Sequence, residues 1–537
     1  MNELMCVIGS GPSGIACAHT LLKAGHRVVL LDVGFTLETE SNEILNSYKS
    51  NQDTDELLEA IHRIRRQHHQ HSQHQPLKTL FGSEHAYRGL QETSIETATR
   101  TAVVRTSLAR GGFSTVWGAT VSTVVPKDIQ AWPITFDDLK PHYAALEEIV
   151  DVSSPMNEMS EIFPMNIGRP PTFPLGMQGN DLFTRLQKHR KELLDDGMHI
   201  GRAKLSVGPK YSLDGKGCTP CGLCMHGCPN NAIFNSAFVL ERFLTHENFT
   251  YCPNMLVESF VEGKDEVTVN IKNIDTVSRS SLTCSRLFLA CGVINTTCIV
   301  ARSLNLTDHQ FSILDSQKYL FPLLRLSRSK GAIKSKENTL AQIYITIDNP
   351  AVSPHTVQLQ YYGYNDLYIE PLRQKLGHNL VGFIPKVTAS VLERLMVAFV
   401  YLHSDDSGTM SFRVYAAGQG NGHMGEIAGH ANPKSITVMH ALLHLLRKHR
   451  SAHGGVPLRI GLQATLPGDS QHIGGTFPMS KTPDKYQTDW LGRPVGCNRV
   501  HLVDSSVFPS IPGTPIAYTM MANASRIAAS VSTKEQG

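Results

Sequence analysis

The sequence lacks any apolar run long enough to cross a membrane. Its longest such runs, 287–294 and 395–402, fall well short of the roughly 18 residues that a membrane-spanning helix needs. The chain also lacks a strong charge of one sign, because its net charge is +3 and its lysines and arginines are dispersed along the sequence. These absences predict a protein without a transmembrane segment and without a nucleic-acid partner.

Room for a secretory signal is lacking as well. The first predicted strand begins within five residues of Met1, which leaves no space for a basic region, an apolar core and a cleavage site. We therefore expect a cytoplasmic location. With 537 residues, of which 41% are hydrophobic and 18% charged, the chain is long enough to build two or more hydrophobic cores.

The first 34 residues have the pattern of a strand, a glycine-rich turn, a helix and a second strand. The apolar stretch 4–8 stops at the segment GSGPSG (9–14), and apolar residues then recur at helical spacing. Asp32 ends the second strand, where a carboxylate can accept hydrogen bonds from ribose hydroxyls. The pattern predicts a site for an adenine dinucleotide and does not distinguish FAD from NAD. Its expected contacts are Gly9, Gly11, Pro12, Ser13, Gly14 and Asp32.

A second glycine-rich turn, ARGGFSTVWG at 109–118, can bring more backbone close to the same cofactor. The residues expected to contribute are Arg110, Gly111, Gly112, Ser114, Trp117 and Gly118. Between the two turns lies a polar insertion with a histidine-rich stretch at 62–74. Clustered histidines can bind metal, but no acid or cysteine completes a site there, so we interpret the stretch as a solvated face.

Four of the eleven cysteines are closely spaced, in the segment CTPCGLCMHGCP at 218–229. The spacing C-x2-C-x2-C-x3-C-P places thiolates at the corners of an iron–sulfur cube, so we expect Cys218, Cys221, Cys224 and Cys228 to be metal ligands. The alternative is a tetrahedral zinc site, which usually uses two CxxC pairs separated by a longer loop. The spacing favours iron–sulfur over zinc, and the expected cytoplasmic location disfavours disulfides.

Two segments near the C-terminus complete the pattern. They are PGDSQHIGGTFPM at 467–479 and VHLVDSSVFP at 500–509. Together with GSGPSG, they resemble the glucose–methanol–choline (GMC) flavoprotein oxidoreductases, which use FAD. In that family the histidine of an HxxGT segment faces the flavin N5 as the catalytic base, and the aspartate of a VDxSxxP segment lies near the ribityl chain and pyrophosphate. Carried over to this chain, the resemblance implies His472 as base and Asp504, Ser505 and Gly292 as FAD contacts.

A narrower resemblance concerns the cysteines. Cys218, Cys224 and Cys228 have the C-x5-C-x3-C-P spacing by which FAD-dependent sugar dehydrogenases of the GMC family hold a three-iron cluster. Because Cys221 adds a fourth thiolate, we expect a 4Fe-4S rather than a 3Fe-4S cluster.

The chain departs from this family at the second catalytic residue. Relatives place Asn or His in an NP-containing turn after the VDxSxxP segment, whereas this chain has Thr514 followed by Pro515. Thr514 and Asn523 are therefore the candidates for that role.

The predicted fold class is α/β, with a Rossmann-like FAD-binding domain and a second, α+β substrate-binding domain. The expected parts of the discontinuous FAD-binding domain are residues 1–40, 95–125, 215–310 and 462–537, with the cysteine loop at 217–229. The expected polar insertion is 41–94, and the expected substrate-binding domain comprises 126–214 and 311–461. Its expected elements are strands at 341–347, 356–362 and 409–415, and helices at 384–402 and 435–450.

We expect an FAD-dependent dehydrogenase that oxidises an alcohol, such as a hydroxyl of a sugar or glycoside, to a carbonyl. His472 would act as base, and electrons would leave through the cluster to a protein or quinone acceptor. One alternative is an oxidase that uses oxygen and keeps the cluster as a structural element. Another is a flavin-binding protein that is stapled by zinc and has lost catalysis.

Overall fold

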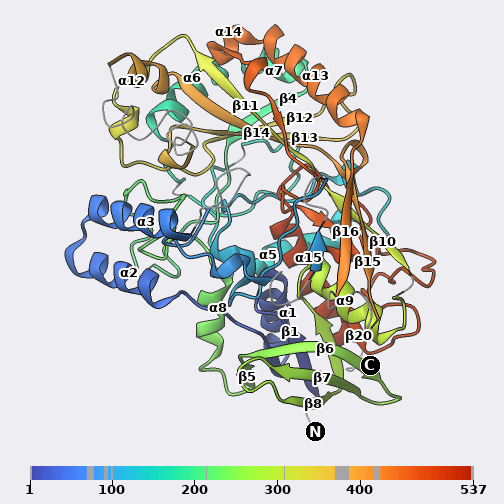
Figure 1. Ribbon diagram of the computed structural model, residues 1–537. Coiled ribbons are helices and arrows are strands. Elements are labelled where there is room, and N and C mark those ends of the chain that lie inside the picture. Colours follow the sequence, from blue (N-terminus) through green and yellow to red (C-terminus); the bar gives the residue numbers. More distant parts are fainter. Residues whose placement is uncertain are drawn as a thin grey trace.

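The computed structural model describes residues 3–68, 78–89, 95–97, 101–156, 158–170, 172–212, 215–307, 309–368, 386–416 and 424–533. Within these residues the chain forms a parallel sheet at the end that holds the N-terminus and a large antiparallel sheet at the opposite end (Figure 1). The mixed α/β fold with a Rossmann-like unit confirms the predicted fold class.

The parallel sheet has the strand order β20-β9-β1-β2-β5. Its strands are β1 (Leu4–Ile8), β2 (Arg27–Leu31), β5 (Phe249–Cys252), β9 (Arg286–Leu289) and β20 (Val500–Leu502). All neighbours run parallel, so their carboxyl ends meet at one edge of the sheet. Helices α1 (Pro12–Lys23) and α9 (Val293–Ser303) begin at that edge, after the glycine turns that follow β1 and β9.

Two helices cover this sheet from sequence positions far apart. Helix α15 (Ala517–Thr533) packs against α1, and α5 (Phe136–Leu146) packs against α15. Tyr143 of α5 stacks on Tyr518 with ring centroids 5.7 Å apart, and both side chains are buried in the core of the parallel sheet. The structure therefore places α5 with the parallel sheet, whereas the sequence assigned all of 126–214 to the substrate-binding domain.

The antiparallel sheet has the order β17-β11-β14-β13-β12-β4, with β18 also paired to β11. Its strands are β4 (Met198–Arg202), β11 (Lys318–Arg325), β12 (Ile343–Ile347), β13 (Val357–Tyr362), β14 (Leu395–Tyr401), β17 (Gly455–Pro457) and β18 (Gln463–Ala464). The helices that cover its outer face are α6 (Met177–Lys188), α7 (Arg190–Asp195), α13 (Pro433–Lys448) and α14 (Arg450–His453) (Figure 1). Its inner face is turned toward the parallel sheet.

The predicted helix at 384–402 was wrong. The described part of this stretch is a short helix, α12 (Lys386–Leu392), followed by strand β14 in the middle of the antiparallel sheet. Alternate residues of β14 are buried under the outer helices, and the others face a cavity on the inner side, so every residue of the strand is buried or half-buried. A strand with two covered faces reads as a continuous apolar run, which periodicity alone does not distinguish from a buried helix.

Two smaller sheets complete the described architecture. One joins β10 (Gln310–Asp315), β15 (Thr409–Val414), β16 (Gly425–His430), β19 (Ile473–Gly474) and β3 (Ile95–Thr97); the other is β6 (Met255–Glu262), β7 (Val267–Asn273) and β8 (Arg279–Cys284). Helices α2 (Thr39–Asn51) and α3 (Thr54–His68) form a hairpin on one side of the molecule, and α8 (Ser236–Phe243) follows the cysteine loop (Figure 1). None of the helices among the described residues is both long enough and apolar enough to span a bilayer.

The glycine turn after β1 gives the first prediction. A Cβ added at Gly14 would lie 1.9 Å from the backbone oxygen of Gly9, whereas a Cβ added at Gly11 meets nothing within 4 Å. Gly14→Ala should therefore lower the free energy of unfolding of the cofactor-free protein by about 2–3 kcal/mol, as overpacking does. Gly11→Ala should change it by less than about 1 kcal/mol. Urea unfolding of both variants tests this, and equal stability would contradict the close packing of helix and turn.

Candidate active site

A cavity of about 1330 Å³ lies between the edge of the parallel sheet and the inner face of the antiparallel sheet. Its wall begins at the glycine turns and Asp32 and ends under strands β11, β13 and β14. Most small-molecule pockets measure about 300–1,000 Å³. This cavity therefore has room for a dinucleotide at one end and a substrate at the other.

A buried carboxylate ties the two glycine turns together at the nucleotide end. Asp32 accepts hydrogen bonds from the hydroxyl groups of Ser10 and Tyr251. Ser10 Oγ in turn accepts a hydrogen bond from the backbone N–H of Gly111, at 2.8 Å. Burial raises the pKa of Asp32 to about 7. Ser10 was missing from the predicted contacts, although it lies inside the GSGPSG motif.

The start of α1 fits a pyrophosphate. Gly11, Pro12 and Ser13 line the cavity, and open space lies where a side chain on Gly11 would be. The hydroxyl of Ser13 is buried and has no hydrogen-bond partner among the described residues. A helix N-terminus with an open backbone and a spare donor suits an anionic group. Gly9 also lines the cavity, whereas Gly14 packs against the backbone of Gly9.

A second carboxylate joins the ends of β20 and β9. Asp504 Oδ2 accepts hydrogen bonds from the N–H of Gly292, at 2.9 Å, and from Thr296 Oγ1, and its Oδ1 accepts one from the N–H of Ser506, at 2.9 Å. Burial raises the pKa of Asp504. Gly292 has a φ of 79° and open space at its Cβ position, so backbone can approach a ligand here too. Ser505 lines the cavity and donates to the carbonyl of Ile473.

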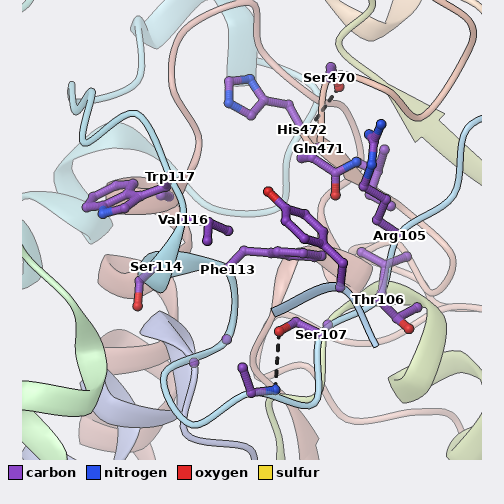
Figure 2. A pocket seen from close by; sticks show the side chains of 18 of the residues that line it. Arg105, Thr106, Ser107, Phe113, Ser114, Val116, Trp117, Ser470, Gln471 and His472 are labelled. Carbon is purple, nitrogen blue, oxygen red and sulfur yellow. Dashed lines mark hydrogen bonds between the residues drawn. The ribbon is translucent and has the colours of Figure 1, made fainter. Parts of the chain in front are cut away.

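The second glycine turn contributes only some of its predicted contacts. Of the six predicted contacts in this turn, four line the cavity: Gly112, Ser114, Trp117 and Gly118. Ala109, Phe113 and Val116 of the same turn line it as well (Figure 2 labels Phe113, Ser114, Val116 and Trp117). Gly111 packs against Asn235. Arg110 is absent from the lining, because its guanidinium pairs with Glu241 at 2.8 Å and lies 5.1 Å from the ring centroid of Tyr251.

His472 lines the same cavity as Arg105, Phe113 and Trp117 (Figure 2). Its backbone is held by two hydrogen bonds, one to Ser470 Oγ at 2.9 Å and one from the N–H of Ser316 at 3.0 Å. Its ring stacks on Tyr401 with centroids 4.8 Å apart. Nδ1 is buried without a partner among the described residues. Burial, with a smaller contribution from the charge of Lys318, lowers the pKa of His472 to about 4. The imidazole is therefore neutral at pH 7.

Sequence analysis did not identify three charged side chains that lie beside His472. Asp469 pairs with Lys318 at 3.1 Å and with Arg105 at 2.9 Å, and all three line the cavity. Burial opposes ionisation of Asp469, but the two cations outweigh it and lower the pKa of this carboxyl. Asp469 lies in the recognised PGDSQHIGGTFPM segment, whereas Arg105 and Lys318 belong to no motif. The trio carries one net positive charge.

Thr514 and Asn523 do not line the cavity. Thr514 is buried, and its neighbour Pro515 reaches the cavity wall instead. Asn523 is buried inside α15, where Oδ1 accepts hydrogen bonds from Arg526 at 3.1 and 2.9 Å. The structure does not bring either candidate for the second catalytic residue to His472.

The four predicted metal ligands lie together in one loop and are free thiols, as are the other seven cysteines. Burial, together with the neighbouring thiols of the loop, raises the pKa of Cys218 to about 12. Burial also raises the pKa of Cys228, and this rise is opposed by backbone N–H groups that point at its sulfur, including that of Ala232 at 3.2 Å. Such N–H groups would stabilise a thiolate. No three of the loop's sulfurs lie within 4.8 Å of one another.

The cysteine loop borders the cavity. Met225, which follows Cys224, lines the cavity wall. Lys78 also lines it and donates a hydrogen bond to the carbonyl of Trp117 at 2.7 Å. Burial lowers the pKa of Lys78 to about 8, and the thiols of Cys224 and Cys228 oppose that shift. Lys78 therefore lies between the loop and the cavity.

The loop is also tied to helix α3. The carboxylate of Asp366 receives hydrogen bonds from His226 in the loop and from His62 in α3, each at 3.1 Å. His62 is thus hydrogen-bonded to a carboxylate of another segment. Residues 69–74 of the predicted histidine-rich stretch fall outside the described residues.

One other group of metal-ligand side chains occurs among the described residues: His355, His403 and Asp405. The two imidazole rings are stacked, with centroids 3.8 Å apart and planes 7° from parallel. The lone pairs of an imidazole lie in its ring plane, so two parallel rings cannot direct theirs at one ion. The group is a hydrogen-bonded stack in which Asp405 raises the pKa of His355.

Comparisons with known proteins agree with this geometry. A family model described as GMC oxidoreductase matches residues 445–524, and a model of the NAD(P)-binding Rossmann-like domain matches residues 7–37. Pyridoxine 4-oxidase from Mesorbium loti superposes with a TM-score of 0.59 at 13% identity, covering 98% of this chain and 99% of its own. A fungal aryl-alcohol oxidase superposes with a TM-score of 0.56 at 12% identity, covering 100% of both chains. A search of curated proteins finds no match.

Asp32 predicts a pH dependence for cofactor binding. Burial raises its pKa to about 7, and the ionised carboxylate accepts hydrogen bonds from ribose hydroxyls more strongly than the protonated acid does. FAD affinity should therefore rise with pH up to about 7 and fall by up to about tenfold per pH unit below it. Near pH 7, binding of FAD should also release the proton that Asp32 loses. Fluorescence titrations at several pH values, with calorimetry in two buffers, measure both effects. Asp32→Asn should remove the pH dependence, and a slope that persists in this variant would refute the assignment.

Proposed function

We propose that the chain is a flavin dehydrogenase of the GMC type, which oxidises an alcohol to a carbonyl and discharges electrons through an iron–sulfur cluster. The observation that carries this proposal is one cavity that joins three features. They are the dinucleotide-type glycine turns, an imidazole that is neutral at pH 7, and the wall of the cysteine loop.

The residues present fit FAD. Gly11 and Gly292 leave space where side chains would block a ligand, Ser13 offers an unpaired hydroxyl, and Asp32 offers a carboxylate for ribose hydroxyls. When bound, FAD would supply the chemistry of hydride acceptance. The protein binds and orients the cofactor.

His472 is the proposed base. Its backbone is held by Ser470 and Ser316, and its ring stacks on Tyr401, so its position is fixed before substrate arrives. Because Nδ1 is buried, Nε2 is the nitrogen that remains to receive the hydroxyl proton from the cavity. A neutral imidazole in a water-poor wall can take that proton as the C–H bond breaks.

A small ring alcohol is the proposed substrate class. The aromatic side chains on the cavity wall are Tyr87, Phe113, Trp117, Tyr362, Phe399 and Tyr401. Aromatic faces are suitable walls for a sugar or an aryl ring. The names of the two similar structures, a pyridoxine oxidase and an aryl-alcohol oxidase, are in keeping with a hydroxyl attached to a ring system.

An iron–sulfur cluster fits the cysteine loop better than zinc. Zinc with bonds of about 2.3 Å to sulfur would hold tetrahedral thiolates roughly 3.8 Å apart. No three of the loop's sulfurs are within 4.8 Å of one another. A cube keeps its cysteine sulfurs farther apart, because iron and sulfide atoms lie between them, and it would supply one-electron transfer. Four cysteines favour a four-iron species.

Both similar structures are oxidases by name, which favours an oxidase as the second candidate. In that case oxygen would take the electrons and the cluster would only brace the loop. The position of the loop supports the dehydrogenase, because Met225 and Lys78 are shared between the loop region and the cavity wall. The experiments below separate the two.

The base assignment is tested under argon. The purified protein should release FAD on heating, and an alcohol from a panel of sugars and aryl alcohols should bleach the bound flavin. His472→Ala should keep FAD and slow bleaching by about 10²–10⁴-fold, the usual contribution of general base catalysis. Stopped-flow absorbance measures the rate. His440→Ala, on the exposed face of α13, is the matched control and should bleach at the parental rate. An unchanged rate in His472→Ala would assign the base elsewhere.

The cluster is tested by single cysteine replacements. Cys224→Ser should lose iron and acid-labile sulfide, and turnover with a one-electron dye should collapse while substrate still bleaches the flavin. Cys221→Ser should give a three-iron cluster with altered potential, since three loop thiolates remain. Metal analysis, electron paramagnetic resonance and dye assays measure these effects. Cys497→Ser, outside the loop, is the control. Zinc in the parent, or equal turnover with and without the cluster, would overturn the dehydrogenase proposal in favour of a structural metal.

A further inference from the structure

Oxidation of an alcohol leaves negative charge on oxygen as the base removes its proton. Neither Thr514 nor Asn523 lines the cavity, so neither can meet that charge. A partner for the oxygen must come from other side chains near His472. Strand β11 supplies one.

Strand register places Lys318 beside the histidine. In the antiparallel pair of β11 and β14, Lys318 lies directly opposite Tyr401. Side chains of such a pair project from the same face of the sheet. Tyr401 stacks on His472, and Lys318 and Tyr401 both line the cavity. The Lys318 ammonium and the His472 imidazole therefore lie in the same part of the cavity.

The partners of the ammonium confirm this location. Lys318 Nζ lies 3.1 Å from Asp469 Oδ2 and 3.5 Å from the backbone oxygen of Asp469, three residues before His472 in the chain. It also lies 5.7 Å from the ring centroid of Phe399, which faces the cavity. An ammonium has three N–H groups. With two turned to Asp469, one is left for a ligand in the cavity.

The charge at this corner is not fully neutralised. Asp469 is shared between Lys318 and Arg105, and the side chains of the three are only 14%, 10% and 7% exposed for Lys318, Arg105 and Asp469. A net positive charge with so little water around it acts strongly on a nearby oxyanion. The same charge disfavours protonation of His472, in line with the lowered pKa of that imidazole. Asp315, also buried here, is engaged by Ser470 and the N–H of Gly468, and burial raises its pKa to about 7, so at neutral pH it offsets only part of this charge.

Resting on the proposed alcohol oxidation, we propose that Lys318 is a catalytic residue that donates a hydrogen bond to the reacting hydroxyl and stabilises its oxygen as the proton leaves. The O–H bond breaks and its proton passes to His472, while the electron pair stays on oxygen beside the ammonium. That pair would then form the C=O bond as the carbon loses its hydride, for which bound FAD would be the acceptor. Lys318 remains protonated throughout.

Lys318→Met tests this role, because it keeps a side chain of similar length and removes the charge. Flavin reduction by the best alcohol of the panel should slow by about 10²–10³-fold, as when one oxyanion donor is lost, with FAD content unchanged. Lys318→Arg should recover part of the rate. Lys318→Ala should be accelerated by added methylamine, which restores an ammonium without restoring the side chain. Lys434→Met, at an exposed lysine of α13, is the matched control.

A second readout does not depend on turnover. Nuclear magnetic resonance of the cofactor-free protein should show a higher pKa for His472 in Lys318→Met than in the parent or in Lys318→Arg. A parental bleaching rate in Lys318→Met, or an unchanged His472 titration with no rescue by methylamine, would overturn the role of Lys318 and leave the proposed function intact. If no alcohol bleaches the parent protein, the proposed function fails, and the catalytic role of Lys318 fails with it.

Discussion

The site depends on two buried carboxylates that hold the carboxyl edge of the parallel sheet together. Asp32 receives a hydrogen bond from Ser10, which itself accepts one from Gly111, so one carboxylate joins the turn after β1 to the second glycine turn. Asp504 joins the end of β20 to the start of α9. Buried carboxylates are costly unless hydrogen-bonded, so these links are strong constraints on where the turns can lie. The cavity exists because these turns converge without filling the space between them.

The two ends of the cavity differ in electrostatic character. The nucleotide end is bordered by carboxylates whose pKa values are raised by burial, and they suit ribose hydroxyls rather than phosphate. The phosphates are left to backbone N–H groups at the start of α1. At the substrate end, the cations around Asp469 face a neutral imidazole. This polarity favours loss of a proton from a bound hydroxyl, because charge that forms on oxygen meets an ammonium.

The antiparallel sheet forms part of the hydrophobic core with one face and lines the cavity with the other. Its outer face packs under α6, α7, α13 and α14, and its inner face presents Lys318, Phe399 and Tyr401 to the cavity. The cysteine loop closes another side, where Met225 reaches the same space. Strand β11 and the cysteine loop region thereby border one cavity, although they lie far apart in the chain. This arrangement is what the proposed separation of hydride removal from electron delivery requires.

The sequence by itself determined the features that depend on local spacing. GSGPSG, the HxxGT segment with His472, Asp504 and the four cysteines are short motifs, in which covalent distance fixes the relative placement of the groups. Tertiary structure alone decided which distant side chains join them. Lys318 reaches His472 through its cross-strand partner Tyr401, and Arg105 does so through Asp469. The strand at 395–401 looked like a helix because both of its faces are covered. Thr514 and Asn523, plausible by position, are turned away because the packing of α15 and its preceding turn, rather than sequence distance, sets their direction.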